Sequence, residues 1–204
     1  MAETEKKQKN KNFNFIVITI IFFLGLSIFQ FFMYRNMRPK FNVVSRVIDF
    51  NIYDDLSLDF NTKVDIQVER EKDFNTLVSS FNTPDEEKLK MFQETLQNLE
   101  KQIPRDFEVL SYDSSVHSNY PFIYVDETVR LKGFVVKNDD GMIEFSLPNQ
   151  LLSGENENVI VTIHFPEEWE VVSVEPTPNY IEQNTIAYSY FGARSYPTVK
   201  FVVE

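Results

Sequence analysis

The chain of 204 residues contains no cysteine, 5 glycines and 2 histidines. The absence of cysteine excludes a disulfide framework, a thiolate metal site and a cysteine nucleophile. With so few glycines, the sequence holds no phosphate-binding loop of the G-x-G-x-x-G or G-x-x-x-x-G-K-S/T kind, so no nucleotide is expected as a partner. Basic residues are in the minority, 20 against 31 acidic. This argues against nucleic acid as a partner, because phosphate binding depends largely on Lys and Arg.

One long segment near the amino terminus carries no charge at all. Between Lys11 and Arg35 lie 23 uncharged residues, and the 20 from Phe15 to Tyr34 are almost all apolar. At 1.5 Å per residue, a helix of that length measures about 30 Å, which is the thickness of the hydrocarbon core of a bilayer. The sequence therefore predicts a transmembrane helix over residues 13–34, with the lipid bilayer as its partner.

The alternative for this segment is a cleaved secretory signal peptide, which also has a basic start and an apolar run. The run here exceeds the usual length of roughly 7 to 15 residues, and the sequence at its exit, QFFMYRNMRPK, has no small-x-small cleavage site. We therefore favour an uncleaved signal anchor. Basic residues number four on the amino-terminal flank and three on the other. A short tail before a large domain suits a cytoplasmic amino terminus and an extracytoplasmic domain.

The charges are distributed unevenly along the chain. Residues 1–40 hold 7 basic and 2 acidic side chains, a net charge of +5, whereas residues 41–204 hold 13 and 29, a net charge of −16. The predicted organisation is a basic cytoplasmic tail (1–12), the membrane helix, a linker (35–42) and an extracytoplasmic β-rich domain (43–204). The negative charge of that domain is expected to repel it from anionic lipid.

After the linker, apolar residues recur with a period of two. They occupy most even positions from Val44 to Ile52 and again from Leu56 to Val68, with polar residues between them. This alternation is typical of half-buried strands. The two acidic residues at positions 54 and 55 suit a tight turn between the runs. The sequence therefore predicts a β-hairpin.

The next segment has the period of a helix near residues 84–103. Thr83 and Glu86 fit a capping box, Pro84 suits the first helical position, and Pro104 ends the pattern. A shorter segment from Asp73 to Phe81 is expected to add one or two helical turns before it. We expect the helix to pack on a sheet through one apolar stripe. The stripe consists of Leu89, Phe92, Leu96, Leu99 and Ile103.

From Phe107 onward the sequence alternates short strands with turns. Strands this short and closely spaced, without helices between them, indicate an antiparallel β-sandwich. The predicted strands are Glu108 to Val116, Ile123 to Val136, Met142 to Ser146, Val159 to Phe165, Trp169 to Val174, Thr185 to Tyr190 and Val199 to Val203.

The segment VIVTIHFPEEWEVVSVEPTPNYIEQNTIAY has a describable order. One strand ends at Phe165-Pro166, Trp169 opens the next, and Pro176-x-Pro178 leads to a third. The segment resembles the carboxy-terminal part of an uncharacterised family of single-pass, membrane-anchored prokaryotic proteins, over most of residues 43–204. The resemblance implies a β-hairpin, an amphipathic helix and an Ig-like β-rich half, but no catalytic residue, because the family has no assigned activity. The fold class expected is thus mainly β (α+β), with a transmembrane helix before an antiparallel Ig-like β-sandwich.

Few residues suit catalysis or metal binding. His164 lies in a predicted strand, where a structural role is expected. His117 is close to Ser114, Ser115 and Ser118, but no Gly-x-Ser-x-Gly elbow accompanies it, and a serine-rich loop explains the spacing equally well. Carboxylates are numerous, and glycoside hydrolysis needs two of them about 5 to 10 Å apart across a cleft. The sequence assigns no catalytic, cofactor-binding or metal-binding residue.

Tyr188, Tyr190, Phe191 and Tyr196, with Arg194 nearby, are the local feature that suggests a contact surface, because Tyr and Arg are enriched at binding hot spots. Packing of the tyrosines in the core is the interpretation that we favour. Two functions stay open. One is a noncatalytic extracytoplasmic domain that contacts an envelope protein or a surface polymer. The other is an extracytoplasmic hydrolase that uses Asp or Glu. The shortage of catalytic groups favours the first.

Overall fold

The computed structural model describes residues 40–81, 83–101, 103, 105–147, 150–151, 157–190 and 194–203. The predicted tail (1–12), the membrane helix (13–34) and most of the linker lie outside these described residues. Within the described part, no helix is long and apolar enough to cross a membrane. The described part is mainly β-sheet and contains two helices.

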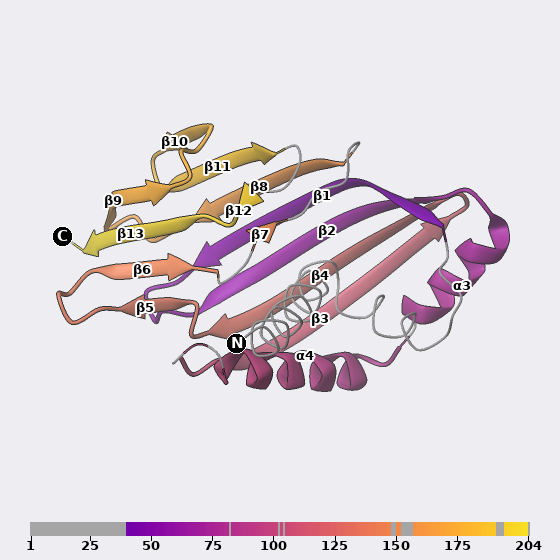
Figure 1. Cartoon of the computed structure of the whole chain (residues 1–204), viewed down its shortest axis with the longest axis horizontal. Helices are drawn as coiled ribbons and strands as arrows, with labels where there is room; N and C mark the ends of the chain where they lie inside the picture. Colours follow the sequence, from indigo (N-terminus) through magenta and orange to yellow (C-terminus); the bar gives the residue numbers. More distant parts are fainter. Residues whose placement is uncertain are drawn as a thin grey trace, which may run out of the picture.

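Figure 1 labels the helices and strands of the described part. Most of the predicted strands are present with bounds close to those expected. The described elements are β1 (Phe41–Ile52), β2 (Leu58–Val68), α3 (Glu71–Phe81), α4 (Asp85–Glu100), β3 (Glu108–Asn119), β4 (Phe122–Lys132), β5 (Val135–Lys137), β6 (Ile143–Ser146), β7 (Gln150–Leu151), β8 (Asn158–His164), β9 (Trp169–Glu175), β10 (Tyr180–Glu182), β11 (Thr185–Tyr190), β12 (Arg194–Ser195) and β13 (Thr198–Val203).

Two sheets form the body of the domain. The larger has seven strands in the order β10-β11-β8-β1-β2-β4-β3, and the smaller has four in the order β5-β6-β13-β9. The seven-stranded sheet is mixed, because β1 pairs antiparallel with β2 but parallel with β8. The expected antiparallel Ig-like sandwich is therefore met only in part. Two sheets share a core, but one of them contains a parallel pair. The alternation of apolar and polar residues does not predict whether a pair of strands is parallel or antiparallel, because side chains alternate in both kinds of pairing.

The predicted hairpin of β1 and β2 is confirmed along its whole length. Asp54 and Asp55 lie in its turn. Asp55 accepts hydrogen bonds from the hydroxyl and, at 3.0 Å, from the backbone N–H of Ser57. These bonds hold the pKa of the Asp55 carboxyl below its usual value of 3.8. The turn is thus stabilised by local bonds to a carboxylate, as expected for acidic turn residues.

The strand predicted from Ile123 to Val136 is divided into β4 and β5. Gly133 lies between them with a φ of +98°, and here the chain leaves the larger sheet for the smaller one. A Cβ at position 133 would lie 2.2 Å from the carbonyl oxygen of Asp106 and 2.8 Å from a ring carbon of Phe107. Glycine is therefore required both for the backbone angle and for the close approach.

The predicted helix is present as α4, but its buried stripe begins differently. Phe92 is buried as expected, and its ring centroid lies 6.4 Å from that of Tyr112 on β3. Leu89 is only half-buried. Lys88, which is 4% exposed, takes the buried position in the first turn.

The start of α4 also differs from the prediction. The expected capping box of Thr83 and Glu86 does not form, because the Thr83 hydroxyl donates instead to the carbonyl oxygen of Ser80 (2.9 Å). The helix begins at Asp85, directly after Pro84, and no side chain caps it. The preceding helix, α3, spans 11 residues rather than the one or two turns expected.

Two hydrophobic clusters lie on one face of the seven-stranded sheet, called here the inner face. The larger joins both sheets with α4, and Phe50 meets Phe145 of the smaller sheet at a centroid distance of 5.1 Å. The smaller joins β2 and β4 with α3. Thr62 and Glu127 are buried between the clusters. The core is thus interrupted by a polar row.

Candidate functional site

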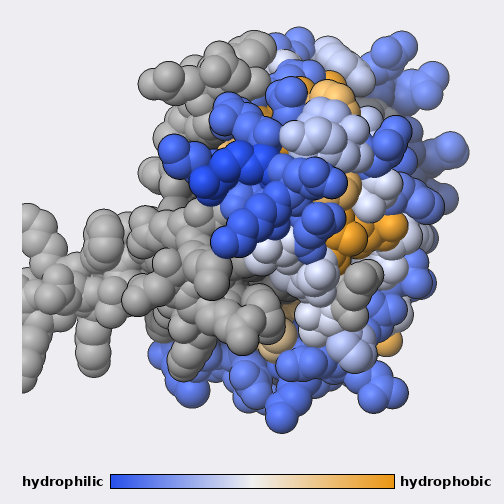
Figure 2. All heavy atoms as spheres, turned by 90° about the vertical axis from the view of Figure 1, so that its right-hand side faces the viewer, coloured by the Kyte–Doolittle hydropathy of each residue, from blue (hydrophilic) through white to orange (hydrophobic). Residues whose placement is uncertain are grey.

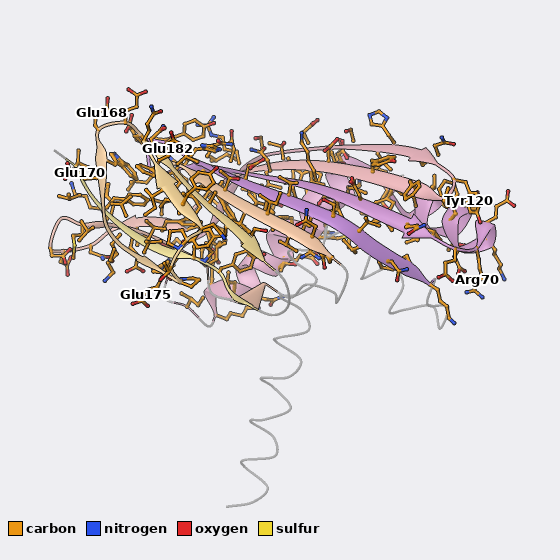
Figure 3. The ribbon with its side chains drawn as sticks, turned by 90° about the horizontal axis from the view of Figure 1, so that it is seen from above. Arg70, Tyr120, Glu168, Glu170, Glu175 and Glu182 are labelled. Atoms are coloured by element: carbon orange, nitrogen blue, oxygen red, sulfur yellow. The ribbon has the colours of Figure 1, made fainter. Side chains whose placement is uncertain are left out.

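The opposite face of the seven-stranded sheet is called here the outer face. All the side chains of β1, β2 and β4 that point to it are exposed or half-buried. The helices and the smaller sheet contribute instead to the two clusters of the inner face. Figure 3 shows the sheet from above, with α3 at one end of the long strands. Within the described part of the chain, the outer face of β1, β2 and β4 is therefore accessible along the strands.

A depression of about 390 Å³ lies in this region of the sheet. Four neighbouring strands, β8, β1, β2 and β4, contribute to it. All the residues that line it are polar or charged, although the side chains of Thr62 and Glu127 are buried on the inner face. The lining residues are Asp49, Asn51, Asn61, Thr62, Lys63, Asp126, Glu127, Thr128 and His164.

The depression offers both donors and acceptors of hydrogen bonds. Asp49 pairs across the strands with Asn61, and Asp126 pairs with Lys63. Because β2 separates them, the Cα atoms of Asp49 and Asp126 lie roughly 12 Å apart. At the edge of the depression, His164 Nδ1 lies 3.1 Å from Thr185 Oγ1. Such a surface can hydrogen-bond a polar ligand, but an open surface does not exclude water from it.

One end of the outer face carries a network around Tyr53. The Tyr53 hydroxyl donates to Asp59 Oδ2 (2.7 Å), and the guanidinium of Arg130 lies 4.6 Å from the centre of the tyrosine ring. Arg130 Nε is also 3.8 Å from Asp59 Oδ1. The hydrogen bond to the Asp59 carboxylate raises the pKa of Tyr53. The network holds an exposed aromatic ring beside the polar depression.

The other end of the outer face carries a second exposed aromatic side chain. Tyr124, 41% exposed, stacks with Phe122 at a centroid distance of 6.3 Å. Its neighbours across the strands are Asp65 and His117. The candidate site is therefore a polar depression between two exposed tyrosines, Tyr53 and Tyr124.

The structure separates Ser114 from His117, although Ser115 shares the outer face of β3 with His117. Ser114 faces α4, whereas His117 is exposed on the outer face of β3. A serine and a histidine on opposite faces of a strand do not form a nucleophile and base. His164 lies in β8 as predicted. His164 also lines the depression. Its position there results from the pairing of β8 with β1, which no local sequence signal indicates.

The suggested tyrosine contact surface is not formed by the residues that the structure describes. Tyr188 and Tyr196 are only 2% and 3% exposed. Both belong to the larger hydrophobic cluster, where the Tyr196 ring meets Phe50 edge-on at 6.5 Å. The favoured interpretation, core packing, is confirmed for these two. Phe191 and the side chains of Tyr190 and Arg194 lie outside the described part.

A polar cluster that the sequence analysis missed joins α4 to β3. Lys88 Nζ donates to Ser114 Oγ (2.7 Å) and lies 3.4 Å from Asp85 Oδ1, while Ser114 Oγ donates to the same carboxylate oxygen (3.0 Å). A lysine that activates a serine has to accept the serine proton as a neutral amine. Here the ammonium donates to the serine, whose own proton points to Asp85. The arrangement fastens the helix to the sheet and does not create a nucleophile.

Two further polar pairs lie in the core. The Tyr112 hydroxyl donates to Glu127 Oε1 (2.9 Å), and burial together with the Glu127 charge raises the pKa of Tyr112. A guanidinium nitrogen of Arg46 lies 2.6 Å from Glu157 Oε1, with exposed fractions of 2% and 3%. Among the described residues, no group of three or more His, Cys, Asp or Glu side chains is arranged to hold a metal ion. The first pair connects β3 with β4, and the second connects β1 with the residue before β8.

A protein-family model matches residues 41–202. The chain belongs to DUF4897, a domain of unknown function. The expectation of a family without an assigned activity is confirmed, and the match covers nearly all of the domain predicted over residues 43–204. No curated protein matches the chain.

Solved structures resemble the DUF4897 domain only loosely. The folded domain of LppM from Mycobacterium tuberculosis, determined by NMR, has a TM-score of 0.48 and 8% identity, over 83% of this chain and 96% of that one. A "putative protease" from Parabacteroides distasonis ATCC 8503 has a TM-score of 0.35 and 7% identity, over 79% of this chain and 40% of that one. Neither similarity bears on the function of the DUF4897 domain.

Proposed function

We propose that this chain is a noncatalytic binding domain, anchored in a prokaryotic cell membrane by residues 13–34 and exposed outside it. In this proposal, the outer face of the seven-stranded sheet contacts an envelope protein or a surface polymer. The observation that carries the proposal is the open outer face, with a polar depression of about 390 Å³ between two exposed tyrosines.

The membrane anchor is supported by the sequence. The apolar segment from Phe15 to Tyr34 has the length of a spanning helix, and lipid favours helix because the backbone polar groups have to be paired internally. The division of charge, +5 before residue 41 and −16 after it, is consistent with a small cytoplasmic tail and a large domain on the other side.

The binding role is supported by the kind of side chains on the outer face. Tyr53 and Tyr124 offer aromatic rings that are 37% and 41% exposed, and the depression between them offers amides, carboxylates, an amine and an imidazole. Aromatic rings beside hydrogen-bonding groups suit sugar rings and protein surfaces alike. Catalysis by a carboxylate pair is less well supported, because Asp49 and Asp126 are separated by a whole strand.

Site-specific photocrosslinking tests the proposed binding face. A photoreactive amino acid replaces Asn61, in the depression, in membranes of cells that naturally make the chain. The matched control replaces Gln93, on the exposed side of α4. We expect an adduct from position 61 that is absent from position 93 and is lost when Asp49→Ala and Lys63→Ala are added. Identical adducts from both positions, or none from either, would contradict the proposal.

The second candidate is a hydrolase, and one observation favours it: Asp49, Asp126 and His164 line the same depression. If the depression is catalytic, Asp49→Asn and Asp126→Asn should each abolish hydrolysis of a glycan or ester panel by the full chain. Hydrolysis that is unchanged in both variants, or that is absent from the unaltered chain, would remove this candidate and leave the binding role.

A further inference from the structure

The point at which the chain enters the domain is fixed to α3. The backbone N–H of Lys40 donates to Asp73 Oδ2 (3.2 Å), and the same carboxylate oxygen accepts a hydrogen bond from Arg70 Nε (2.7 Å). Arg70 is itself 59% exposed. Lys40 therefore marks where the domain is attached to whatever precedes it.

The length of chain before Lys40 limits how far this end lies from the bilayer. The predicted membrane helix ends at Tyr34, so five residues, 35–39, separate it from Lys40. A fully extended chain covers about 3.5 Å per residue, so these residues span roughly 20 Å at most. The end of the domain that carries α3 is thus within reach of the lipid headgroups.

This end, called here the α3 end, consists of Lys40, residues 69–73 and the β3–β4 turn at Tyr120. Tyr120 is 48% exposed, its hydroxyl donates to the carbonyl oxygen of Glu69 (2.8 Å), and its ring meets Phe74 edge-on at 5.5 Å. Figure 2, which looks onto this end, shows hydrophobic side chains beside strongly hydrophilic ones. Tyr side chains are enriched at membrane–water interfaces, where the ring sits at the level of the headgroups.

The charges at the α3 end are balanced, whereas those at the far end are not. Lys40, Arg70 and Lys72 offset Glu69, Glu71 and Asp73. At the far end, around β9 and β10, Figure 3 shows the labelled glutamates at positions 168, 170, 175 and 182, all of which are exposed. An anionic leaflet repels the far end and leaves the neutral end free to approach.

We propose that the α3 end docks on an anionic bilayer surface and that the acidic end points away from it. The inference rests on the membrane anchor of the proposed function. Because the long strands run from one end of the domain to the other, this orientation stands the outer face upright on the membrane. The depression then lies on the side of the upright domain, where a partner in the envelope can reach it.

The absence of cysteine allows a direct test on the full chain. Asn75→Cys on α3 and Glu182→Cys at the far end, both exposed positions, each receive one fluorophore. The labelled chains are reconstituted into vesicles of phosphatidylcholine and phosphatidylglycerol that carry a headgroup quencher. We expect quenching at position 75 to exceed that at position 182 several-fold. Equal quenching, or stronger quenching at position 182, overturns the docking.

Two further readouts separate this inference from the anchor. A chain that does not float with the vesicles overturns the anchor and the docking together, whereas a chain that floats with equal quenching overturns the docking alone. Lys72→Glu should lower the docked population roughly fivefold, because one basic residue near an anionic surface changes binding by about that factor. Lys90→Glu, on α4, is the matched control and should have no effect. An equal effect of both variants also overturns the docking.

Discussion

At the scale of residues, the core contains charged side chains that a simple apolar pattern does not predict. Arg46 occupies an inward position of β1, where alternation alone called for an apolar residue, and it is paired with Glu157. Lys88 replaces Leu89 as the buried residue of the first turn of α4, since its amine reaches Ser114. Helical spacing found the stripe but missed this residue, because the partner on β3 is supplied by the tertiary fold.

The Arg46–Glu157 pair leads to a prediction about stability. Arg46→Met leaves a carboxylate in the core without its guanidinium and should cost about 3–5 kcal/mol in the free energy of unfolding. The double variant Arg46→Met and Glu157→Leu should recover part of this loss, because it removes the second buried charge as well. Denaturant unfolding of the full chain in detergent measures both. The single variant Glu157→Leu completes the set, and a double variant that loses the sum of the two single losses would contradict the pairing of these charges.

The pKa of Asp73 leads to a prediction about pH. Burial would raise this pKa, but the Lys40 N–H and the Arg70 guanidinium outweigh burial and hold it below 3.8. A carboxyl with a lowered folded pKa stabilises the fold above its unfolded pKa, and the stabilisation is lost as the pH falls through the folded pKa. Asp73→Asn should therefore destabilise the chain by about 1–2 kcal/mol at pH 7, and the difference should shrink as the pH falls below 3.8 and through the folded pKa.

Denaturant titrations at a series of pH values check the Asp73 prediction. Asp113→Asn, at an exposed position of β3, is the control and should show little difference from the unaltered chain at any pH. A loss in Asp73→Asn that does not shrink as the pH falls below 3.8 would show that the carboxylate charge is not its cause.

At the scale of elements, period-two alternation and turn residues located β1, β2 and most later strands within a few residues. These sequence signals failed where contacts with another element determine the bounds of a strand or helix. The strand expected from Ile123 to Val136 breaks at Gly133, because the loop at Asp106 packs against that glycine. α3 was expected to be shorter, and its buried residues are held by β2 and β4 rather than by helix signals of its own. The candidate site was not predicted, because it arises where β8 joins β1.

Gly133 and Gly141 form a matched pair for testing the break between β4 and β5. Both have a positive φ, +98° and +85°, but a Cβ at Gly141 meets nothing within 4 Å. Gly141→Ala should cost about 1–2 kcal/mol for the backbone angle alone. Gly133→Ala should cost at least roughly 2 kcal/mol more, because the methyl group overlaps the Asp106 carbonyl. Thermal or denaturant unfolding compares them, and equal losses would refute the steric role of Asp106.

At the scale of the whole molecule, the proposed arrangement is a charged, elongated domain joined to a membrane at one end. The whole-chain charge of −11 is the sum of a +5 segment and a −16 segment, which in this account are separated by the bilayer. Within the described domain, charge is again distributed unevenly between the two ends. Its attachment point at Lys40 lies in a balanced region, whereas the far end carries the exposed glutamates at positions 168, 170, 175 and 182. Sequence composition indicated the first asymmetry, and only the fold reveals the second.

The most direct test of the membrane-anchored arrangement is the accessibility of single cysteines in spheroplasts of a bacterial host. Glu168→Cys lies at the exposed far end of the domain, and Lys6→Cys lies in the predicted tail. A membrane-impermeant maleimide should label position 168 in intact spheroplasts and position 6 only after detergent is added. Labelling of position 6 in intact spheroplasts, with position 168 protected until detergent is added, would contradict the account.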